Sequence, residues 1–365
     1  MTRQRLSFGL VAWMALCGSL TAFAQAKRKP LYEKVVARAT NYLRTKGQAA
    51  DGSFSRHLGP AITALVTTAV IKNGGGNDPM VAKSLKFLDK FVQKDGGIYQ
   101  PKSLYRNYET SLAILCLDAA NKGGRYTKTI KRARAFIRGL QWDKSEGITK
   151  SSPKFGGAGY GKHRRPDLSN TSYFVDALKG SKDKEDLDAI KRALLFISRC
   201  QNKESPHNTT PFAAKINDGG FYYTPANGGK SQAETTANGG LRSYASMTYA
   251  GLKSMIYAGV DPADLRVKAA LSWIKSNYDL KSNPGLGSSG LFYYYHTFAK
   301  ALHALKTEVF VDKSGKKHFW KNELLGELNR RQRSDGSWAN SNQRWLESDP
   351  NLVTAYALMA LSYCK

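Results

Sequence analysis

Three residues that could move a proton occur at equivalent places in the sequence: Glu109, Asp167 and His296. Each lies at or just before the start of an apolar run, and a threonine follows within four positions. A carboxylic acid in a dry cavity keeps its proton to a higher pH and can act as a general acid, and an imidazole can act as an acid or a base. These three are the candidate catalytic residues. The alternative is that each caps a helix or complements its dipole.

Aromatic and cationic residues surround the same places, in the segments where the apolar runs begin. The candidate ligand-binding residues are Arg106, Arg164, Tyr108, Tyr173, Tyr244, Tyr295 and Arg242. Helix N-termini that converge on one mouth attract anions, and arginines beside them would strengthen that attraction. The pattern predicts an aromatic cavity below a cationic rim, which suits an amphiphile with an anionic head such as a polyprenyl phosphate. The alternative for the tyrosines is ordinary packing between buried helices.

The elements that must position these residues form a repeat. An amphipathic helix is followed by a glycine turn with an aromatic residue, and then by a helix that is apolar on nearly every side. The clearest copy covers residues 331–361, and five more precede it. A threonine near the start of each apolar helix marks the six copies: Thr63, Thr110, Thr171, Thr248, Thr297 and Thr354.

The two kinds of helix in each copy predict how the copies are arranged. A helix that is apolar all round must be buried on all sides, and an amphipathic partner can cover it. An open array of repeats needs polar end caps, yet the last copy ends on an apolar run at residues 360–364. We therefore predict an all-α fold, a closed α6/α6 toroid of six helical-hairpin repeats. A short open solenoid is the alternative.

The N-terminal segment predicts export. Residues 1–26 combine Arg3 and Arg5 with an apolar run and a small-x-small site that ends at Ala24 or Ala26, which is typical of a signal peptide. Residues 27–365 are expected to form a single domain. The localisation that follows is periplasmic or secreted.

The remaining cysteines, Cys116, Cys200 and Cys364, lie in helical apolar runs and are odd in number. Buried thiols are therefore expected rather than disulfides.

The net charge of +28 favours anionic ligands and surfaces. The lysines are spread along helix faces rather than clustered, so we expect no nucleic-acid partner. The expected partners are a lipid or another anionic small molecule, together with contact at a membrane surface. The sequence does not indicate an oligomeric state.

The last repeat resembles a known family. The run from Gln332 through Gly336 to Trp338 is similar to the QW repeat of squalene–hopene cyclases and to the repeat of protein prenyltransferase β-subunits. The resemblance implies the α/α toroid of the prenyltransferase/squalene oxidase repeat superfamily and a central lipid-binding cavity. It says little about activity, because such toroids host several functions.

The family's reactive motifs are incomplete here. Asp167 matches the first Asp of the cyclase Asp-x-Asp-Asp-Thr-Ala motif, but Ser169 and Asn170 stand where the protonating acids would be. His296 matches one prenyltransferase zinc ligand, whereas Arg242 and Tyr244 occupy the places of the other two. We therefore expect no metal and no cofactor.

Three functional interpretations remain open. The first is a cyclase-like toroid that binds an isoprenoid or another amphiphilic anion, with or without catalysis. The second is an acidic-polysaccharide lyase or binder, for which a basic cleft would suit β-elimination. The third is a non-catalytic scaffold.

Overall fold

The computed structural model describes residues 28–162 and 165–365, so the predicted signal peptide and Arg164 lie outside the described residues. This part of the chain is mostly helical, as predicted. It also contains one short antiparallel hairpin that the repeat pattern did not predict, formed by β1 (Phe310–Val311) and β2 (Lys317–His318). Within the described ranges, no helix is both long and apolar enough to cross a membrane.

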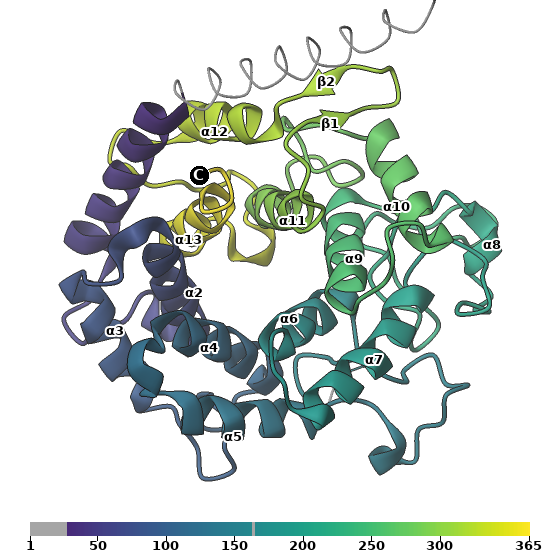
Figure 1. The fold of residues 1–365 in the computed structure, drawn as a ribbon, viewed down its shortest axis with the longest axis horizontal. Helices are drawn as coiled ribbons and strands as arrows, with labels where there is room; N and C mark the ends of the chain where they lie inside the picture. Colours follow the sequence, from purple (N-terminus) through teal and green to yellow (C-terminus); the bar gives the residue numbers. More distant parts are fainter. Residues whose placement is uncertain (1–27, 163–164) are drawn as a thin grey trace, which may run out of the picture.

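The six predicted apolar helices form an inner ring. They are α2 (Pro60–Val70), α4 (Arg106–Ala120), α6 (Leu168–Leu178), α9 (Ala245–Tyr257), α11 (Leu291–Ala304) and α13 (Pro350–Leu361). Each helix packs against the next, and α13 packs against α2, so the first and last repeats meet (Figure 1). Burial follows from the sequence: every residue of α2 is buried.

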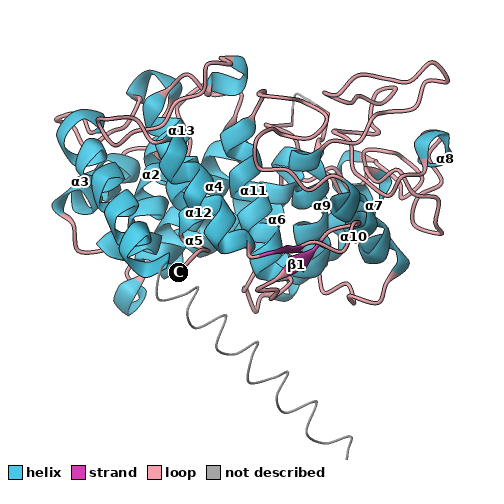
Figure 2. Cartoon of the chain, turned by 90° about the horizontal axis from the view of Figure 1, so that it is seen from above, coloured by secondary structure: helices cyan, strands magenta, loops and turns pink. Residues whose placement is uncertain are grey.

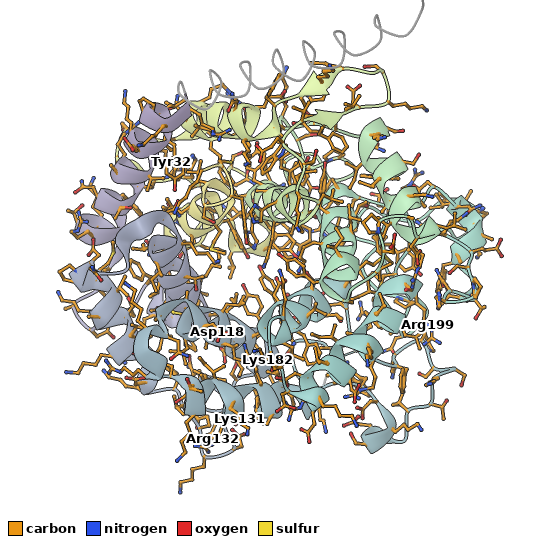
Figure 3. All side chains as sticks on the ribbon, in the orientation of Figure 1. Tyr32, Asp118, Lys131, Arg132, Lys182 and Arg199 are labelled. Atoms are coloured by element: carbon orange, nitrogen blue, oxygen red, sulfur yellow. The ribbon has the colours of Figure 1, made fainter. Side chains whose placement is uncertain are left out.

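The amphipathic helices lie outside this ring. They cover residues 28–42 and the segments α3 (Pro79–Asp89), α5 (Thr127–Arg138), α7 (Lys184–Arg199), α10 (Leu265–Ser276) and α12 (Trp320–Arg331). On α5, Ile130 and Ile137 are buried, whereas Lys131 and Arg132 project from the outer surface (Figure 3). The outer surface therefore carries much of the positive charge.

The fourth repeat departs from the pattern. It contains an additional short helix, α8 (Ala213–Ile216), and the long loops near it project beyond one end of the helices (Figure 2). The three cysteines behave as predicted, since Cys116, Cys200 and Cys364 are buried free thiols.

The recurrent threonines have a structural reason. The Thr354 hydroxyl accepts a hydrogen bond from the backbone N–H of Trp338 at 3.1 Å, so the turn of its repeat is tied to the following inner helix. The equivalent bond satisfies a buried N–H in four other copies, through Thr63, Thr110, Thr171 and Thr248. Thr297 differs because its hydroxyl donates to the carbonyl of Tyr294.

In four repeats a glutamine joins the turn to the next outer helix, and Gln48 is the first of them. Gln332 Nε2 donates to the carbonyls of Gly336 at 2.9 Å and of Val35 at 3.0 Å, and Val35 belongs to the first helix of the chain. Gln141 and Gln201 each make the equivalent pair of bonds, one to the turn of their own repeat and one to the next outer helix. Gln332 therefore helps to hold the last repeat to the first.

Gly336 lies close to the backbone of Arg38 at the same junction between the last and first repeats. Its φ is +92°, and a Cβ added there would lie 2.4 Å from the carbonyl oxygen of Arg38. We expect Gly336→Ala to lower the free energy of unfolding by about 3 kcal/mol, because backbone strain and overpacking add. Gly74→Ala is the matched control: its φ is +97° and no atom lies within 4 Å, so only the strain of about 1 kcal/mol applies. Equal losses in urea unfolding would show that Gly336 is not a packing point between the repeats.

Candidate functional site

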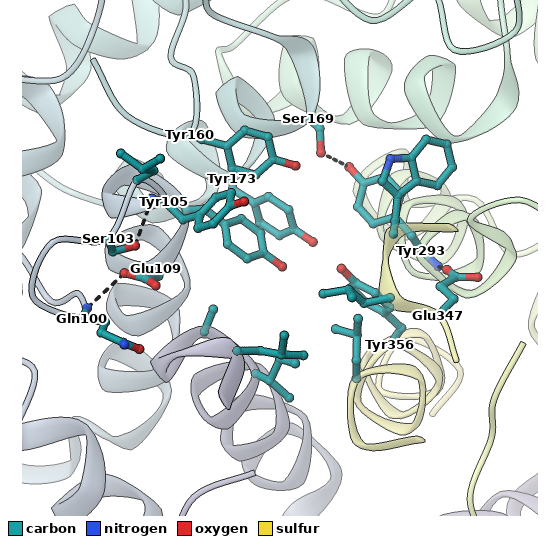
Figure 4. A pocket seen from close by; sticks show the side chains of 18 of the residues that line it. Gln100, Ser103, Tyr105, Glu109, Tyr160, Ser169, Tyr173, Tyr293, Glu347 and Tyr356 are labelled. Atoms are coloured by element: carbon teal, nitrogen blue, oxygen red, sulfur yellow. Dashed lines mark hydrogen bonds between the residues drawn. The ribbon is translucent and has the colours of Figure 1, made fainter. Parts of the chain in front are cut away.

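The principal cavity lies where the inner helices begin. Its volume is about 800 Å³, and residues at the starts of all six inner helices contribute to its wall. Its lining is rich in aromatic side chains (Figure 4). They are Tyr105, Tyr108, Tyr160, Tyr173, Tyr223, Tyr244, Tyr293, Tyr356 and Trp345. Three of the predicted ligand-binding residues, Tyr108, Tyr173 and Tyr244, are therefore in the lining.

The tyrosine rings form a continuous series of contacts. Tyr108 and Tyr173 have ring centroids 5.5 Å apart, Tyr173 and Tyr293 are 6.3 Å apart, and Tyr293 and Tyr356 are 5.7 Å apart. The Tyr293 hydroxyl lies 3.0 Å from Ser169 Oγ. Burial raises the pKa of each of these four tyrosines, so their hydroxyls stay protonated and can donate hydrogen bonds to a ligand.

Glu109 is one of two buried carboxyl groups in the cavity lining. It lies in the first turn of α4, is only 3% exposed and is part of the lining. One carboxylate oxygen accepts a hydrogen bond from the backbone N–H of Gln100 at 3.1 Å. Burial raises the pKa of Glu109 to about 7, and the hydrogen bonds from Gln100 and Ser103 oppose that rise only in part. The side chain can therefore deliver a proton near neutral pH.

The raised pKa of Glu109 predicts a pH-dependent stability. The carboxyl loses its proton near its ordinary pKa of 4.5 when the chain is unfolded, but near 7 when it is folded. Its contribution to stability is therefore complete below pH 4.5 and is lost as the pH rises toward 7, by about 3 kcal/mol. Glu109→Gln cannot titrate. We expect this variant to lose about 3 kcal/mol less than the wild type between about pH 4 and pH 8 in urea unfolding. Parallel stability curves for the two proteins would contradict the raised pKa.

Asp167 occupies a different position from Glu109. It is the N-cap of α6, with one carboxylate oxygen accepting from the backbone N–H of Asn170 at 2.9 Å and the other from the Asn170 side chain at 2.8 Å. Burial raises its pKa to about 6. It is absent from the cavity lining, but Tyr223, which lines the cavity, donates a hydrogen bond to it. Asp167 therefore caps a helix and supports one tyrosine of the wall.

His296 lies deeper than the lining. It is 3% exposed, its ring stacks on Tyr356 at 6.0 Å, and its Nδ1 has no hydrogen-bond partner among the described residues. Burial, and then the nearby Lys300, lower its pKa to about 3. The imidazole is therefore neutral. Within the described ranges, no group of three or more His, Cys, Asp or Glu side chains is placed to hold a metal ion.

The two predicted arginines that the structure describes, Arg106 and Arg242, are not in the lining. The Arg106 guanidinium is 5.1 Å from the ring centroid of Tyr99 and donates to the carbonyl of Ser103, and Arg242 is exposed. Tyr295 is buried in the helical wall, where its hydroxyl donates to the carbonyl of Leu280 at 2.6 Å. Among the described residues, the cationic side chain that does line the cavity is Lys102.

Sequence reasoning missed a second acid in the lining. Glu347 faces Glu109 across the cavity (Figure 4). Its carboxylate accepts from the backbone N–H of Tyr293 at 2.8 Å and from the Asn340 side chain at 2.7 Å, which anchors it to the N-terminus of α11. Burial raises its pKa. The sequence does show that Glu347 lies just before the last inner helix, which could have marked it as a candidate. The segment that contains it has no apolar periodicity, so its course could not be predicted.

Comparisons with known proteins show the fold. No protein-family model matches the chain, and no curated relative matches it. A glycosyl hydrolase of family 88 from Bacteroides vulgatus has a TM-score of 0.55 at 11% identity, covering 91% of this chain and 97% of that one. A GH76 α-mannanase from Bacteroides thetaiotaomicron has a TM-score of 0.52 at 13% identity, covering 92% and 95%. A polysaccharide lyase has a TM-score of 0.52 at 9% identity, covering 91% and 96%.

This chain has the α/α toroid fold. Identities this low carry no further conclusion about activity. A type II terpene cyclase from Scytonema also overlaps 92% of the chain, but its TM-score of 0.36 is too low to support the predicted cyclase-like identity.

Proposed function

We propose that the chain is a closed α6/α6 toroid that binds a saccharide in its tyrosine-lined cavity and cleaves a glycosidic bond with Glu109 as the general acid. The observation that carries this proposal is the buried Glu109 carboxyl, which faces the cavity with a pKa of about 7. Cleavage of a glycosidic bond, whether by hydrolysis or by β-elimination, requires a proton for the oxygen that leaves. A carboxyl that still holds its proton near neutral pH can supply it.

The lining supports a sugar as the ligand. A pyranose has flat C–H faces, which pack on aromatic rings, and hydroxyl groups at its edges, which need donors and acceptors. The tyrosines provide rings and hydroxyls together, and Ser169 and Ser246 add further hydroxyls. The three toroid neighbours described above carry names of saccharide-cleaving enzymes, which favours a saccharide as the ligand.

The charge of the protein favours an acidic sugar. Lys102 lines the cavity together with Glu109 and Glu347, so it is the chain as a whole, with a net charge of +28, that favours an acidic sugar. The predicted signal peptide would export the protein to where extracellular polysaccharides occur. An acidic polysaccharide that carries uronate units is therefore the substrate class we test first.

Product analysis on a defined set of polysaccharides tests the proposal. The purified protein is incubated with alginate, polygalacturonate, hyaluronan, heparan sulfate, xylan and α-mannan. New reducing ends report any cleavage, and unsaturated uronates report elimination. We expect cleavage of at least one uronate-containing polymer. No new reducing end from any of the six would overturn the proposed activity and favour a scaffold.

A second candidate ligand is an isoprenoid or another amphiphile with an anionic head. The observation that favours it is a set of apolar side chains in the cavity lining: Leu58, Ala61, Ile62, Met247 and Leu352. Organic extraction of the purified protein followed by mass spectrometry distinguishes the two candidates. A stoichiometric polyprenyl lipid in the extract, without polysaccharide cleavage, would replace the saccharide by the lipid.

A further inference from the structure

Exposed apolar side chains gather at the mouth of the cavity. Eight large hydrophobic residues of the described chain are exposed, and four of them line this mouth. They form two pairs on separate loops: Leu104 and Tyr105 are 52% and 45% exposed, and Trp345 and Leu346 are 42% and 50% exposed. A cluster of this kind on a folded surface usually marks a binding site.

The loop that carries Trp345 is held in a costly conformation. Trp345 and Leu346 both have a left-handed backbone, with φ of 57° and 65°, although neither is glycine. Such residues cost about 1–3 kcal/mol each and persist where neighbouring contacts impose them. The contacts are present here. The Trp345 indole packs on Gly290, and the Arg344 guanidinium lies 4.2 Å from the indole ring centroid. Glu347, which directly follows Leu346, is hydrogen-bonded to the N-terminus of α11.

Tyr105 extends the aromatic series of the cavity outward. Its ring centroid lies 5.1 Å from that of Tyr160, and Tyr160 lies 6.1 Å from Tyr108 inside the cavity. A ligand that packs on these rings can therefore continue from the interior to the exposed loop without a break in aromatic surface.

Three amide side chains share the lining with these residues: Gln100, Gln232 and Gln343. An amide offers both donors and an acceptor, which matches a sugar hydroxyl, itself a donor and an acceptor. Gln232 is already oriented, since its carbonyl oxygen accepts from Arg344 at 2.5 Å. A membrane surface would gain nothing from three amides, so this composition favours a saccharide over a bilayer.

We propose that Tyr105 and Trp345 bind sugar units outside the cavity, so that the ligand is a polysaccharide chain that extends over both loops rather than a mono- or disaccharide. This inference rests on the proposed function, because it assumes that the cavity binds a sugar. Beyond that function, the substrate is a long chain, and Tyr105 and Trp345 set the specificity for its length.

The test compares binding as a function of chain length. Affinities of the wild type, Tyr105→Ser and Trp345→Ala are measured by calorimetry for the disaccharide and the hexasaccharide of polygalacturonate, alginate and hyaluronan. Leu265→Ser is the matched control, since Leu265 is 72% exposed and lies on α10 outside the mouth. We expect each mouth variant to bind the hexasaccharide about tenfold more weakly and to change disaccharide binding less than about twofold, whereas the control changes neither.

The outcomes separate this inference from the proposed function. Equal losses for both lengths, or no loss for either, would overturn the inference while leaving cleavage by Glu109 intact. A length-dependent loss together with normal cleavage by Glu109→Gln would support the mouth sites and overturn the role of Glu109. Binding of the wild type to phosphatidylglycerol vesicles through Tyr105 and Trp345, with no saccharide bound, would make the mouth a membrane surface and overturn both.

Discussion

Replacing Glu109 with glutamine lowers the rate of glycosidic cleavage by about 10²–10⁴-fold, because a positioned general acid contributes an effect of that size. Glutamine keeps the shape of the side chain and can still meet the backbone N–H of Gln100, so saccharide binding should change little. The loss should therefore appear in kcat rather than in KM. The measurement is a steady-state rate on whichever polymer the wild type cleaves.

The pH profile and a neighbouring variant control for an indirect effect. The wild-type rate should fall above about pH 7 as Glu109 loses its proton, and the residual rate of the Glu109→Gln variant should lack that limb. Asp167→Asn is the matched control, since asparagine also caps helices and Asp167 does not line the cavity. We expect it to keep more than about a third of the rate. A loss as large as that of the Glu109 variant would mean that the acid has been assigned to the wrong carboxyl.

A large loss of stability is expected when Asp176, which forms buried ion pairs between the inner helices, is replaced by asparagine. Asp176 on α6 bonds Lys253 Nζ of α9 at 2.6 Å and Lys300 Nζ of α11 at 2.5 Å, and all three side chains are at most 9% exposed. Asp176→Asn removes the counter-charge of two buried amino groups, Lys300 and Lys253, and burial already lowers the pKa of Lys253 to about 7. Breaking a buried pair in this way costs about 3–5 kcal/mol, which urea unfolding would measure as a loss of stability.

Two further variants test whether charge is the cause. Asp188→Asn removes an exposed partner of Lys191 and should change stability by less than about 0.5 kcal/mol. Adding Lys253→Met to Asp176→Asn removes one uncompensated charge and should restore part of the stability. If the double variant is no more stable than the single one, the loss comes from packing and not from unpaired charge.

The repeat pattern predicted the helical pairs because the residues that define it make the same bonds in successive copies. The threonine hydroxyl holds the turn in five copies, and the glutamine amide reaches the next outer helix at Gln141, Gln201 and Gln332. Such bonds join residues at fixed spacings, so the sequence displays them directly. The contact between α13 and α2 was predicted from the apolar end of the chain, which needs a partner.

The site was predictable only in part, because part of its wall comes from loops without periodicity. Glu109, Tyr108 and Tyr173 sit on helices, and Tyr244 is the N-cap of α9, so their places were visible in the sequence. Glu347 and Trp345 sit on a loop whose course depends on contacts with Gly290 and α11, which are distant in the chain. Arg106 was placed correctly along the chain, as the first residue of α4, but its guanidinium packs on Tyr99 instead of lining the cavity.

The proposed activity depends on the protonation state of Glu109, and carbon-13 NMR measures that state directly. The full protein is labelled at the side-chain carboxyl carbons of glutamate, and the resonance that disappears in Glu109→Gln is assigned to this residue. Its chemical shift is then followed against pH. We expect a titration midpoint of about 7, so that a large share of the carboxyl still holds its proton at neutral pH. A midpoint near the ordinary glutamate value of 4.5 would contradict it, since Glu109 would then be ionised and unable to act as the acid.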